Sequence, residues 1–159
     1  MPRPNRLILA GQTHHIVQRG NNRQAVFFND DDRRAFLKWL GLALGAEGCV
    51  LHAYVLMTNH FHLVLTAGNE ESIPRLMQSV GRRYVAHVNR AYGRTGTLWE
   101  GRYKSTILDS ETYVLACHRY VESNPLRARM VSRPEDYPWS SYRHNALGRG
   151  DPLLREHAT

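Results

Sequence analysis

The sequence is short of cysteine, of lysine and of long apolar runs, and each shortage excludes a class of protein. The two cysteines, Cys49 and Cys117, form no CxxC pair, so a disulfide framework is excluded and a reducing cytoplasm is the expected location. No stretch approaches the roughly 20 apolar residues that span a bilayer, and the first residues have no apolar run of signal-peptide length. With no repeats or low-complexity segments, the 159 residues predict one globular domain.

Positive charge is in excess, and arginine supplies almost all of it. Lys and Arg together number 21 against 14 Asp and Glu, which gives a formal net charge of +7. Only Lys38 and Lys104 are lysines. Guanidinium groups bind phosphate through paired hydrogen bonds, so a nucleic acid is the leading class of partner. A basic protein that binds no nucleic acid is the alternative.

Apolar spacing predicts an alternation of strands and helices. A short strand over 14–19 precedes a helix that Asn29 caps and that Gly45 and Gly48 end. Strands over 54–57 and 60–65 follow, then a helix over about 72–92 and a strand or hairpin over 98–108. This βαββαβ order is typical of an α+β, ferredoxin-like fold, in which two helices cover one face of an antiparallel sheet.

The chain is expected to have three parts. Residues 1–12 are rich in Pro and Arg and predict a basic N-terminal arm, and residues 13–145 form the folded domain. Residues 146–159 form a polar C-terminal tail. A further helix, capped by Asp109 or Ser110 and running to Asn124, follows the last strand.

Two histidines separated by one apolar residue open the strand over 60–65. Successive side chains of a strand point to opposite faces, so His60 and His62 share one face while Phe61 points to the other. Two neutral imidazoles side by side on a rigid strand can hold a metal ion. Polar residues that merely alternate on a half-exposed strand are the alternative. His14 and His15 are adjacent and cannot both face one side, so we do not predict both as ligands.

The late helix carries a second set of polar side chains on one face. Tyr113, Cys117, Tyr120 and Asn124 are spaced at i, i+4, i+7 and i+11. If this helix covers the open face of the sheet, the Tyr120 phenol and the Asn124 amide meet the two imidazoles. Tyr113 is predicted to pack in the core.

Several basic and amide side chains are candidate nucleic-acid contacts because of their charge and position. Trp99 and Tyr103 alternate with cations, which suits stacking on single-stranded bases, although both rings could equally belong to the core. The turn after Arg19 and the basic face of the helix over 72–92 have ordinary structural explanations as well. The candidates are Arg3, Arg6, Arg19, Asn21, Arg23, Arg82, Arg83, Arg102 and Lys104.

The sequence resembles the single-tyrosine HUH transposases, in particular the REP-associated tyrosine transposases of bacteria. The resemblance rests on two motifs, His60-Phe61-His62 after Met57-Thr58-Asn59, and the stretch from Arg119 to Ala128 that contains Tyr120 and Asn124-Pro125. Residues 15–21, 99–103 and 137–142 also fit. Together the matching stretches span about residues 3–145.

This resemblance implies an HUH fold with the ferredoxin-like sheet and an additional helix that carries the tyrosine. It implies that His60, His62 and Asn124 bind a divalent metal, Mg²⁺ or Mn²⁺, and that Tyr120 is the nucleophile. The expected activity is cleavage and rejoining of single-stranded DNA near hairpin repeats, through a 5′-phosphotyrosyl intermediate. A domesticated hairpin-binding protein without cleavage, or a hydrolase that uses water, is the alternative, and a homodimer is left open.

Overall fold

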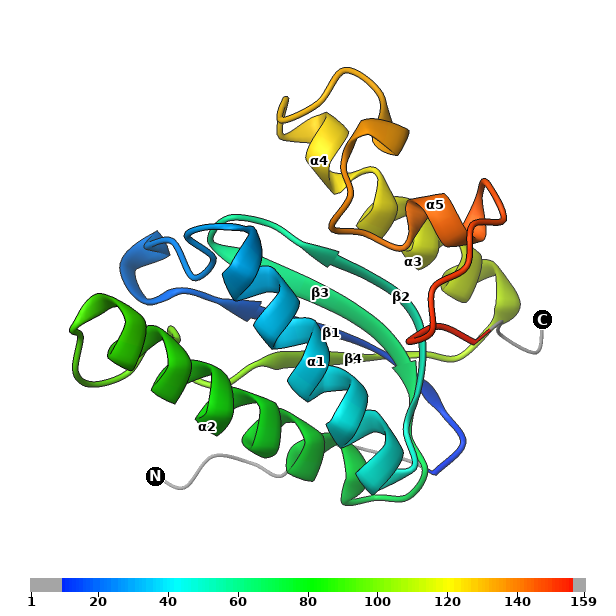
Figure 1. The fold of residues 1–159 in the computed structure, drawn as a ribbon. Helices are drawn as coiled ribbons and strands as arrows, with labels where there is room; N and C mark the ends of the chain where they lie inside the picture. Colours follow the sequence, from blue (N-terminus) through cyan, green and yellow to red (C-terminus); the bar gives the residue numbers. More distant parts are fainter. Residues whose placement is uncertain (1–9, 156–159) are drawn as a thin grey trace.

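A computed structural model describes residues 10–155 and contains a four-stranded antiparallel sheet. Its strands are β1 (Thr13–Arg19), β2 (Val50–Leu56), β3 (His60–Thr66) and β4 (Lys104–Leu108). They are arranged in the order β2-β3-β1-β4, all neighbours antiparallel (Figure 1). This is the strand order that a ferredoxin-like βαββαβ chain gives, so the predicted fold class is confirmed.

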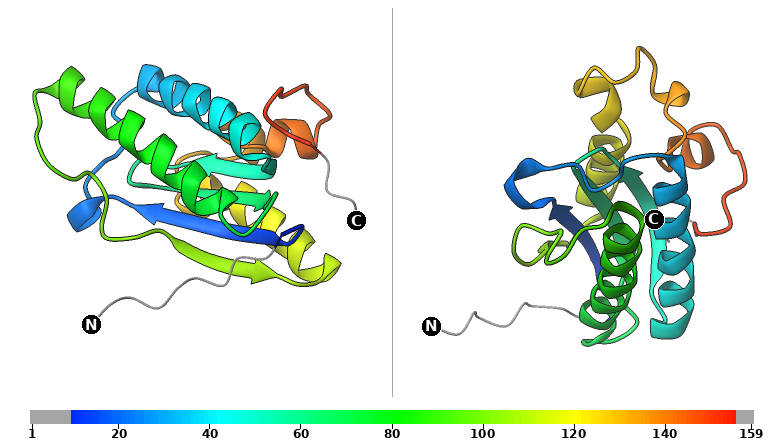
Figure 2. Two further views of the ribbon diagram at one scale, coloured as in Figure 1. Left: turned by 90° about the horizontal axis from the view of Figure 1, so that it is seen from below. Right: turned by 60° about the vertical axis from the view of Figure 1, so that its left-hand side comes forward.

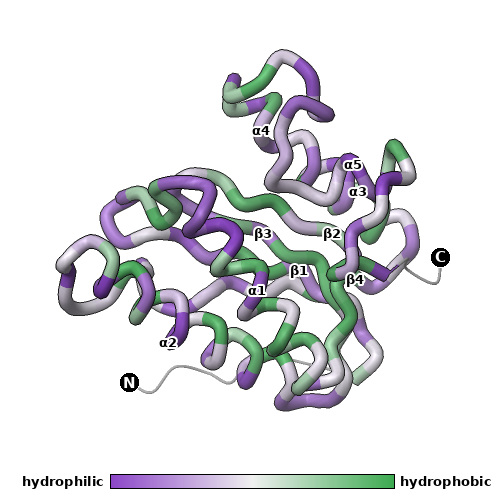
Figure 3. The backbone as a smooth tube through the Cα atoms, viewed as in Figure 1, coloured by the Kyte–Doolittle hydropathy of each residue, from purple (hydrophilic) through white to green (hydrophobic). Residues whose placement is uncertain are grey.

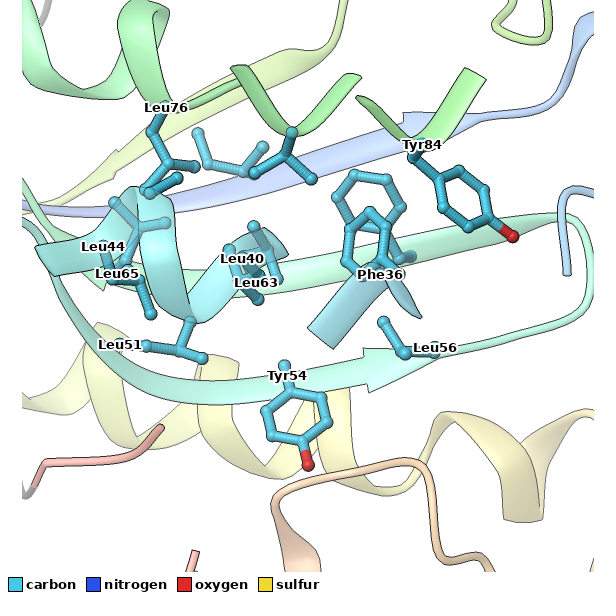
Figure 4. Packing of buried hydrophobic residues seen from close by; sticks show 14 of the residues in the cluster. Phe36, Leu40, Leu44, Leu51, Tyr54, Leu56, Leu63, Leu65, Leu76 and Tyr84 are labelled. Carbon is cyan, nitrogen blue, oxygen red and sulfur yellow. The ribbon is translucent and has the colours of Figure 1, made fainter. Parts of the chain in front are cut away.

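Helices α1 (Asp30–Glu47) and α2 (Ser72–Tyr92) cover one face of this sheet (Figures 1 and 2). The Asn29 side chain caps α1 by accepting a hydrogen bond from the Asp32 amide, as predicted, and Gly48 ends the helix in the left-handed conformation. Phe36 and Leu40 from α1 and Leu76 and Tyr84 from α2 pack on the sheet (Figure 4).

The opposite face of the sheet is also covered. Helix α3 (Glu111–Glu122) packs there against β2, β3 and β4, and Figure 2 shows α3 across the sheet from α1 and α2. Cys117 and Val121 of α3 form a second core with Val64 of β3, and Val114 of the same helix is buried as well. Because both faces are covered, β2 and β3 are almost entirely buried and are drawn as largely apolar stretches in Figure 3.

Two segments differ from the expected layout. Within 98–108 only β4 is a regular strand, and the preceding residues cross the end of β1 through single contacts such as the bridge between Gly20 and Trp99. Residues expected in a polar tail pack on the domain as far as the structure describes them, because Leu154 is buried against β2 and Asp151 accepts a hydrogen bond from the Tyr54 hydroxyl.

Both cysteines are free and buried. None of the helices found within residues 10–155 combines the length and apolar character needed to cross a bilayer. Arg3 and Arg6, in the expected N-terminal arm, lie outside the described residues.

Candidate active site

Strand β3 presents His60 and His62 to the face of the sheet that α3 covers. Phe61, between them, is buried in the core under α1 and α2, so the alternation predicted from the sequence is confirmed. In the pairing of β1 with β3, Arg19 lies opposite His60 and Val17 lies opposite His62. His15, two residues before Val17, therefore reaches the same face, diagonally across from His62.

Three imidazoles are linked at this point. His15 Nε2 lies 2.8 Å from His62 Nδ1, and the two rings are nearly parallel with centroids 5.1 Å apart. The His60 ring lies 5.1 Å from the His62 ring, almost perpendicular to it. The Asn59 side-chain oxygen accepts a hydrogen bond from His60 Nδ1 at 2.7 Å, so Nε2 of His60 carries a lone pair.

The surroundings keep these imidazoles neutral. Burial, with Arg19 adding to it, lowers the pKa of His60 to about 4. Burial, together with the positive charge of neighbouring His and Arg side chains, lowers the pKa of His62 to about 3. Burial also lowers the pKa of His15. At neutral pH each ring therefore keeps an unprotonated nitrogen, which is the form that binds a metal ion.

Helix α3 brings Tyr120 to the imidazoles. The Ser110 hydroxyl caps the start of the helix by accepting a hydrogen bond from the Tyr113 amide. The Tyr120 ring then lies edge-on to both His62 and His15, with centroid distances of 5.8 and 6.2 Å. Tyr120 is nevertheless 51% exposed, so its phenol is accessible to a large substrate.

Asn124 reaches the same group of side chains, although the helix ends earlier than predicted. We expected one helix to run to Asn124, but α3 ends at Glu122 and Asn124 begins the short helix α4 (Asn124–Arg127). Pro125 has no amide hydrogen to donate to the Val121 carbonyl, so the regular helical ladder stops before it. The Asn124 Nδ2 atom lies 2.9 Å from His62 Nε2.

The donors around His62 fit a divalent ion. The Asn124 amide donates to His62 Nε2, so His62 Nδ1 carries the hydrogen that is donated to His15. His60 and His62 thus both donate through Nδ1 and keep a lone pair on Nε2, the arrangement typical of metal-bound imidazoles. A half-turn of the Asn124 amide places its oxygen about where Nδ2 now lies. With 2.9 Å between the observed atoms, the Asn124 oxygen and His62 Nε2 would be close enough to hold the same ion.

The choice of ligands narrows the choice of metal. Among the residues that the structure describes, no three His, Cys, Asp or Glu side chains are grouped closely enough to hold a metal ion by themselves. Two imidazoles and one amide oxygen are the candidate donors of this arrangement, and such a set would leave positions for oxygen ligands from water or phosphate. Such a mixed set suits Mg²⁺ or Mn²⁺ better than a tetrahedral zinc site.

Tyr113 does not pack in the core, so that prediction was wrong. It is 61% exposed. The buried residues of α3 are Val114, Cys117, Val121 and Glu122, and Tyr113 precedes the first of these. No ring contact joins Tyr113 to the imidazoles, whereas Tyr120 has two.

Arg127 lies directly against Tyr120. Its guanidinium carbon is 4.3 Å from the centre of the Tyr120 ring, and its Nη2 donates a 2.8 Å hydrogen bond to the Tyr120 carbonyl. Nη1 of the same guanidinium donates to the Ser123 hydroxyl. Arg127 thus fixes the turn between α3 and α4 and places a permanent positive charge beside the phenol.

A buried carboxyl group fastens α3 to the sheet of its own chain. Glu122 is 7% exposed, and its Oε2 accepts hydrogen bonds from the Ser141 hydroxyl and from Asn145 Nδ2. The Ser141 hydroxyl also accepts from the Tyr54 amide in β2. Burial raises the pKa of Glu122. This network ties the helix that carries Tyr120 to the neighbouring strand.

Four of the predicted nucleic-acid contacts gather in one place. Arg19, Arg23, Arg102 and Lys104, with Val17 and Glu100, line a hollow that we call the basic hollow. Val17 and Lys104 are paired across β1 and β4, and both point to the face that carries His62. The basic hollow therefore opens beside the imidazoles.

A glycine shapes the turn that carries two of these arginines. A Cβ atom on Gly20 would lie 2.3 Å from the Gln24 carbonyl oxygen, so only glycine fits this turn. Asn21, another predicted contact, starts the same turn and is exposed.

Arg82 and Arg83 are not part of this group. Both lie on α2, which packs on the opposite face of the sheet.

Sequence reasoning missed His15 and Arg127 as members of the site. His15 depends on the register between β1 and β3, and no local pattern sets that register. Arg127 lies beyond the break at Pro125, where helical spacing no longer predicts direction. The only available signal for Arg127 was its place in the stretch that resembles the tyrosine transposases.

Comparisons with known proteins identify the family and the fold. The family model described as "Transposase IS200 like" matches residues 9–124. A solved structure of a REP-associated tyrosine transposase bound to a REP hairpin is similar, with a TM-score of 0.78 and 16% identity over 100% of this chain and 94% of that chain. A proposed transposase from Deinococcus radiodurans R1 has a TM-score of 0.51 and 19% identity over 77% and 97% of the respective chains. No curated protein matched. At these identities the two structures show a shared fold.

Proposed function

Because this chain belongs to the family of IS200-like transposases, we propose that it cleaves and rejoins single-stranded DNA with Tyr120 as the nucleophile. The observation that carries the proposal is the contact of the exposed Tyr120 phenol with two neutral imidazoles, the buried His62 and the partly buried His15. Packing alone does not explain a phenol in this position, because the ring is exposed. It is, however, well placed to attack a phosphate bound between α3 and the sheet.

The reaction is a transesterification in which one phosphoester bond replaces another. The Tyr120 oxygen attacks phosphorus and loses its proton, and the bond from phosphorus to the 3′ oxygen breaks. That oxygen takes up a proton and becomes a free 3′-hydroxyl, while the 5′-phosphate stays on the tyrosine. The new ester keeps the bond energy, so a second 3′-hydroxyl can reverse the step and rejoin strands.

His60, His62 and Asn124 would hold a Mg²⁺ or Mn²⁺ ion, which supplies charge neutralisation and orientation of the phosphate. His15 keeps the His62 ring in place through the 2.8 Å contact between their nitrogens. Arg19, opposite His60 on β1, and Arg127, beside the phenol, would pair with the phosphate oxygens on either side of the reacting group.

Tyr120 would act in the site of its own chain. Helix α3 is fixed to β2 by the Glu122 network, and Tyr120 reaches His62 without any contribution from a second copy. A homodimer is therefore not needed to complete the site.

The expected substrate is a DNA hairpin with a single-stranded flank. The similar solved structure is of a transposase bound to a REP hairpin, and the basic hollow offers four cations beside the imidazoles. Single-stranded backbone is bound in this way by clustered Arg and Lys side chains. Arg19→Ala should weaken hairpin binding without changing the affinity for Mn²⁺.

The covalent intermediate gives the most direct test. Labelled single-stranded hairpin DNA is incubated with the protein and Mn²⁺, and the adduct is looked for on a denaturing gel. Tyr120→Phe should abolish the adduct. Tyr113→Phe is the matched control, because Tyr113 is exposed on the same helix without contact to the imidazoles, and it should leave the adduct unchanged.

Each outcome distinguishes a different function. Hairpin binding without an adduct in the wild-type protein would indicate a binding protein rather than an enzyme. Cleavage that survives Tyr120→Phe would indicate a hydrolase that uses water. Loss of the adduct in both tyrosine variants would exclude a unique role for Tyr120.

A further inference from the structure

A second hollow lies on the opposite side of the sheet from Tyr120. It has a volume of about 880 Å³ and is bounded by one side of α2, by residues 99–103 and by Gln18 and Phe61 of the sheet. We call it the aromatic pocket, because Trp99 and Tyr103 are among the side chains that line it. Its volume is within the range of cavities that bind small molecules and cofactors.

The charged side chains that line the aromatic pocket are all positively charged. Arg75, Arg82 and Arg102 line it, and no Asp or Glu side chain does. Arg75 is paired with Glu71 at 2.6 Å, which leaves Arg82 and Arg102 as the cations without a carboxylate partner in that lining. An apolar, aromatic interior under an arginine rim suits a flat ring joined to a phosphate.

The aromatic wall is already in position. The Trp99 ring lies edge-on to Phe61, with centroids 5.7 Å apart, and nearly parallel to Tyr84 at 6.2 Å. The indole also lies against α2, since a Cβ atom on Gly81 would be in ordinary van der Waals contact with Trp99 Nε1, at 3.7 Å. A ligand would therefore not have to organise this wall before stacking on it.

The aromatic pocket and the basic hollow meet at one residue. Arg102 lines both, and the segment that carries it crosses the end of β1, where the Glu100 amide donates to the Arg19 carbonyl. Gln18 and Arg19 are adjacent in β1, so Gln18 faces the aromatic pocket while Arg19 faces the basic hollow. A DNA strand that leaves the imidazoles through the basic hollow can thus pass round the end of β1 to reach the aromatic pocket.

We propose that the aromatic pocket binds an unpaired nucleobase of the DNA strand on which the protein acts, with the adjoining phosphates on Arg82 and Arg102. The identity of this ligand rests on the function proposed above. Trp99 and Tyr103 supply the stacking surface. Gln18, which is 6% exposed and whose Nε2 donates to the Gly101 carbonyl at 3.3 Å, supplies an amide oxygen that can accept from a base edge. The pocket would select a position in the single-stranded flank, apart from the phosphate that Tyr120 attacks.

Neighbouring arginines of α2 provide a matched test. Arg82 lines the aromatic pocket and Arg83 does not, although both are exposed on the same helix. Ala86 is exposed and also lines the pocket, so Ala86→Phe fills the space without entering the core. The probe is a hairpin with a single-stranded flank in which 2-aminopurine replaces one base at a time. The fluorescence of this analogue falls when it stacks on an aromatic ring.

The wild-type protein should quench the analogue at one flank position and not at its neighbours. Ala86→Phe should abolish that quenching and weaken binding of the flanked hairpin about tenfold, since stacking of one base contributes on that order. Arg82→Ala should weaken it severalfold, while Arg83→Ala, which removes the same charge, should have a smaller effect. A blunt hairpin without the flank should bind all four proteins with affinities that differ little.

The two proposals can fail separately. If Ala86→Phe and Arg82→Ala bind the flanked hairpin as the wild type does, or if quenching is equal at all positions, the pocket does not bind a base. The covalent adduct on Tyr120 would still form in that case. Absence of the adduct in the wild-type protein, with position-specific quenching intact, would refute the cleavage function and leave the base-binding pocket standing.

Discussion

Acid should destabilise this protein through His62, and replacing His62 should remove that part of the acid sensitivity. Burial first, and then the neighbouring positive charges, lower the pKa of His62 to about 3 in the folded protein. In the unfolded chain the same imidazole titrates at about 6.5. Between these values the unfolded chain binds a proton that the folded protein does not. The contribution of the neutral His62 to the free energy of unfolding is therefore fully present above about pH 6.5 and is lost as the pH falls toward about 3.

The size of the effect follows from the shift. Each pH unit inside this window changes the free energy of unfolding by about 1.4 kcal/mol for one group. From pH 7 to pH 5, integration gives a loss of about 2 kcal/mol for His62. The side chain is only 4% exposed, so screening by solvent reduces this figure little. His62→Gln removes the titrating group and keeps a polar side chain.

The free energies of unfolding of the wild type and of His62→Gln are measured at pH 5, 6 and 7 by urea denaturation followed by circular dichroism. A chelator is present to exclude metal ions. His62→Gln is expected to be less stable at pH 7 because it loses the contacts to His15 and Asn124. That deficit should shrink by about 2 kcal/mol at pH 5. His144→Gln, in the short helix after Ser141, controls for loss of a histidine outside the site. Parallel curves for the wild type and His62→Gln would refute the argument that His62 is held neutral.

Three further substitutions test other parts of the site. Arg127→Ala should slow adduct formation at least tenfold in single-turnover assays, because the charge 4.3 Å from the Tyr120 ring is lost, and an unchanged rate would exclude that role. Glu122→Ala removes the carboxylate that accepts from the buried Ser141 hydroxyl and from Asn145 Nδ2 and should cost about 1–3 kcal/mol of stability in the same urea assay. Gly20→Ala places a Cβ 2.3 Å from the Gln24 carbonyl, so hairpin affinity should fall severalfold while the global unfolding transition changes less.

The fold was predictable because the spacing of apolar residues that identifies each helix and strand is a local feature of the sequence. Two-residue alternation from Phe61 to Leu65 and helical spacing in α1 and α2 each identify an element without reference to the rest of the chain. The order of these elements then leaves few ways to form a sheet. The segment before β4 was not predictable in the same way. Trp99 and Tyr103 suggested a strand, but they line the side of α2, and only tertiary packing makes that choice.

The sequence predicted two pairs of site residues, but it did not predict that the two pairs lie together. Alternation places His60 and His62 on one face, and helical spacing places Tyr120 near Asn124. The two pairs meet only because α3 covers the free face of the sheet. This contact joins elements far apart in sequence, since Asn124 and His62 are separated by 62 residues. The resemblance to tyrosine transposases supplied this connection in advance, whereas residue spacing left it as one possibility.

Exposure alone would not have identified the nucleophile. Tyr113 and Tyr120 are 61% and 51% exposed, and both are large aromatic side chains left outside the buried side of α3. An exposed aromatic ring next to the buried imidazole of His62 is a local departure from the rule that apolar surface is buried, and such departures are common at functional sites. Within residues 10–155, Tyr120 has these imidazole neighbours and a guanidinium against its ring, whereas Tyr113 has neither. The distinction between the two tyrosines is therefore made by α3 packing on β2 and β3, which turns position 120 toward His62 and leaves position 113 in solvent.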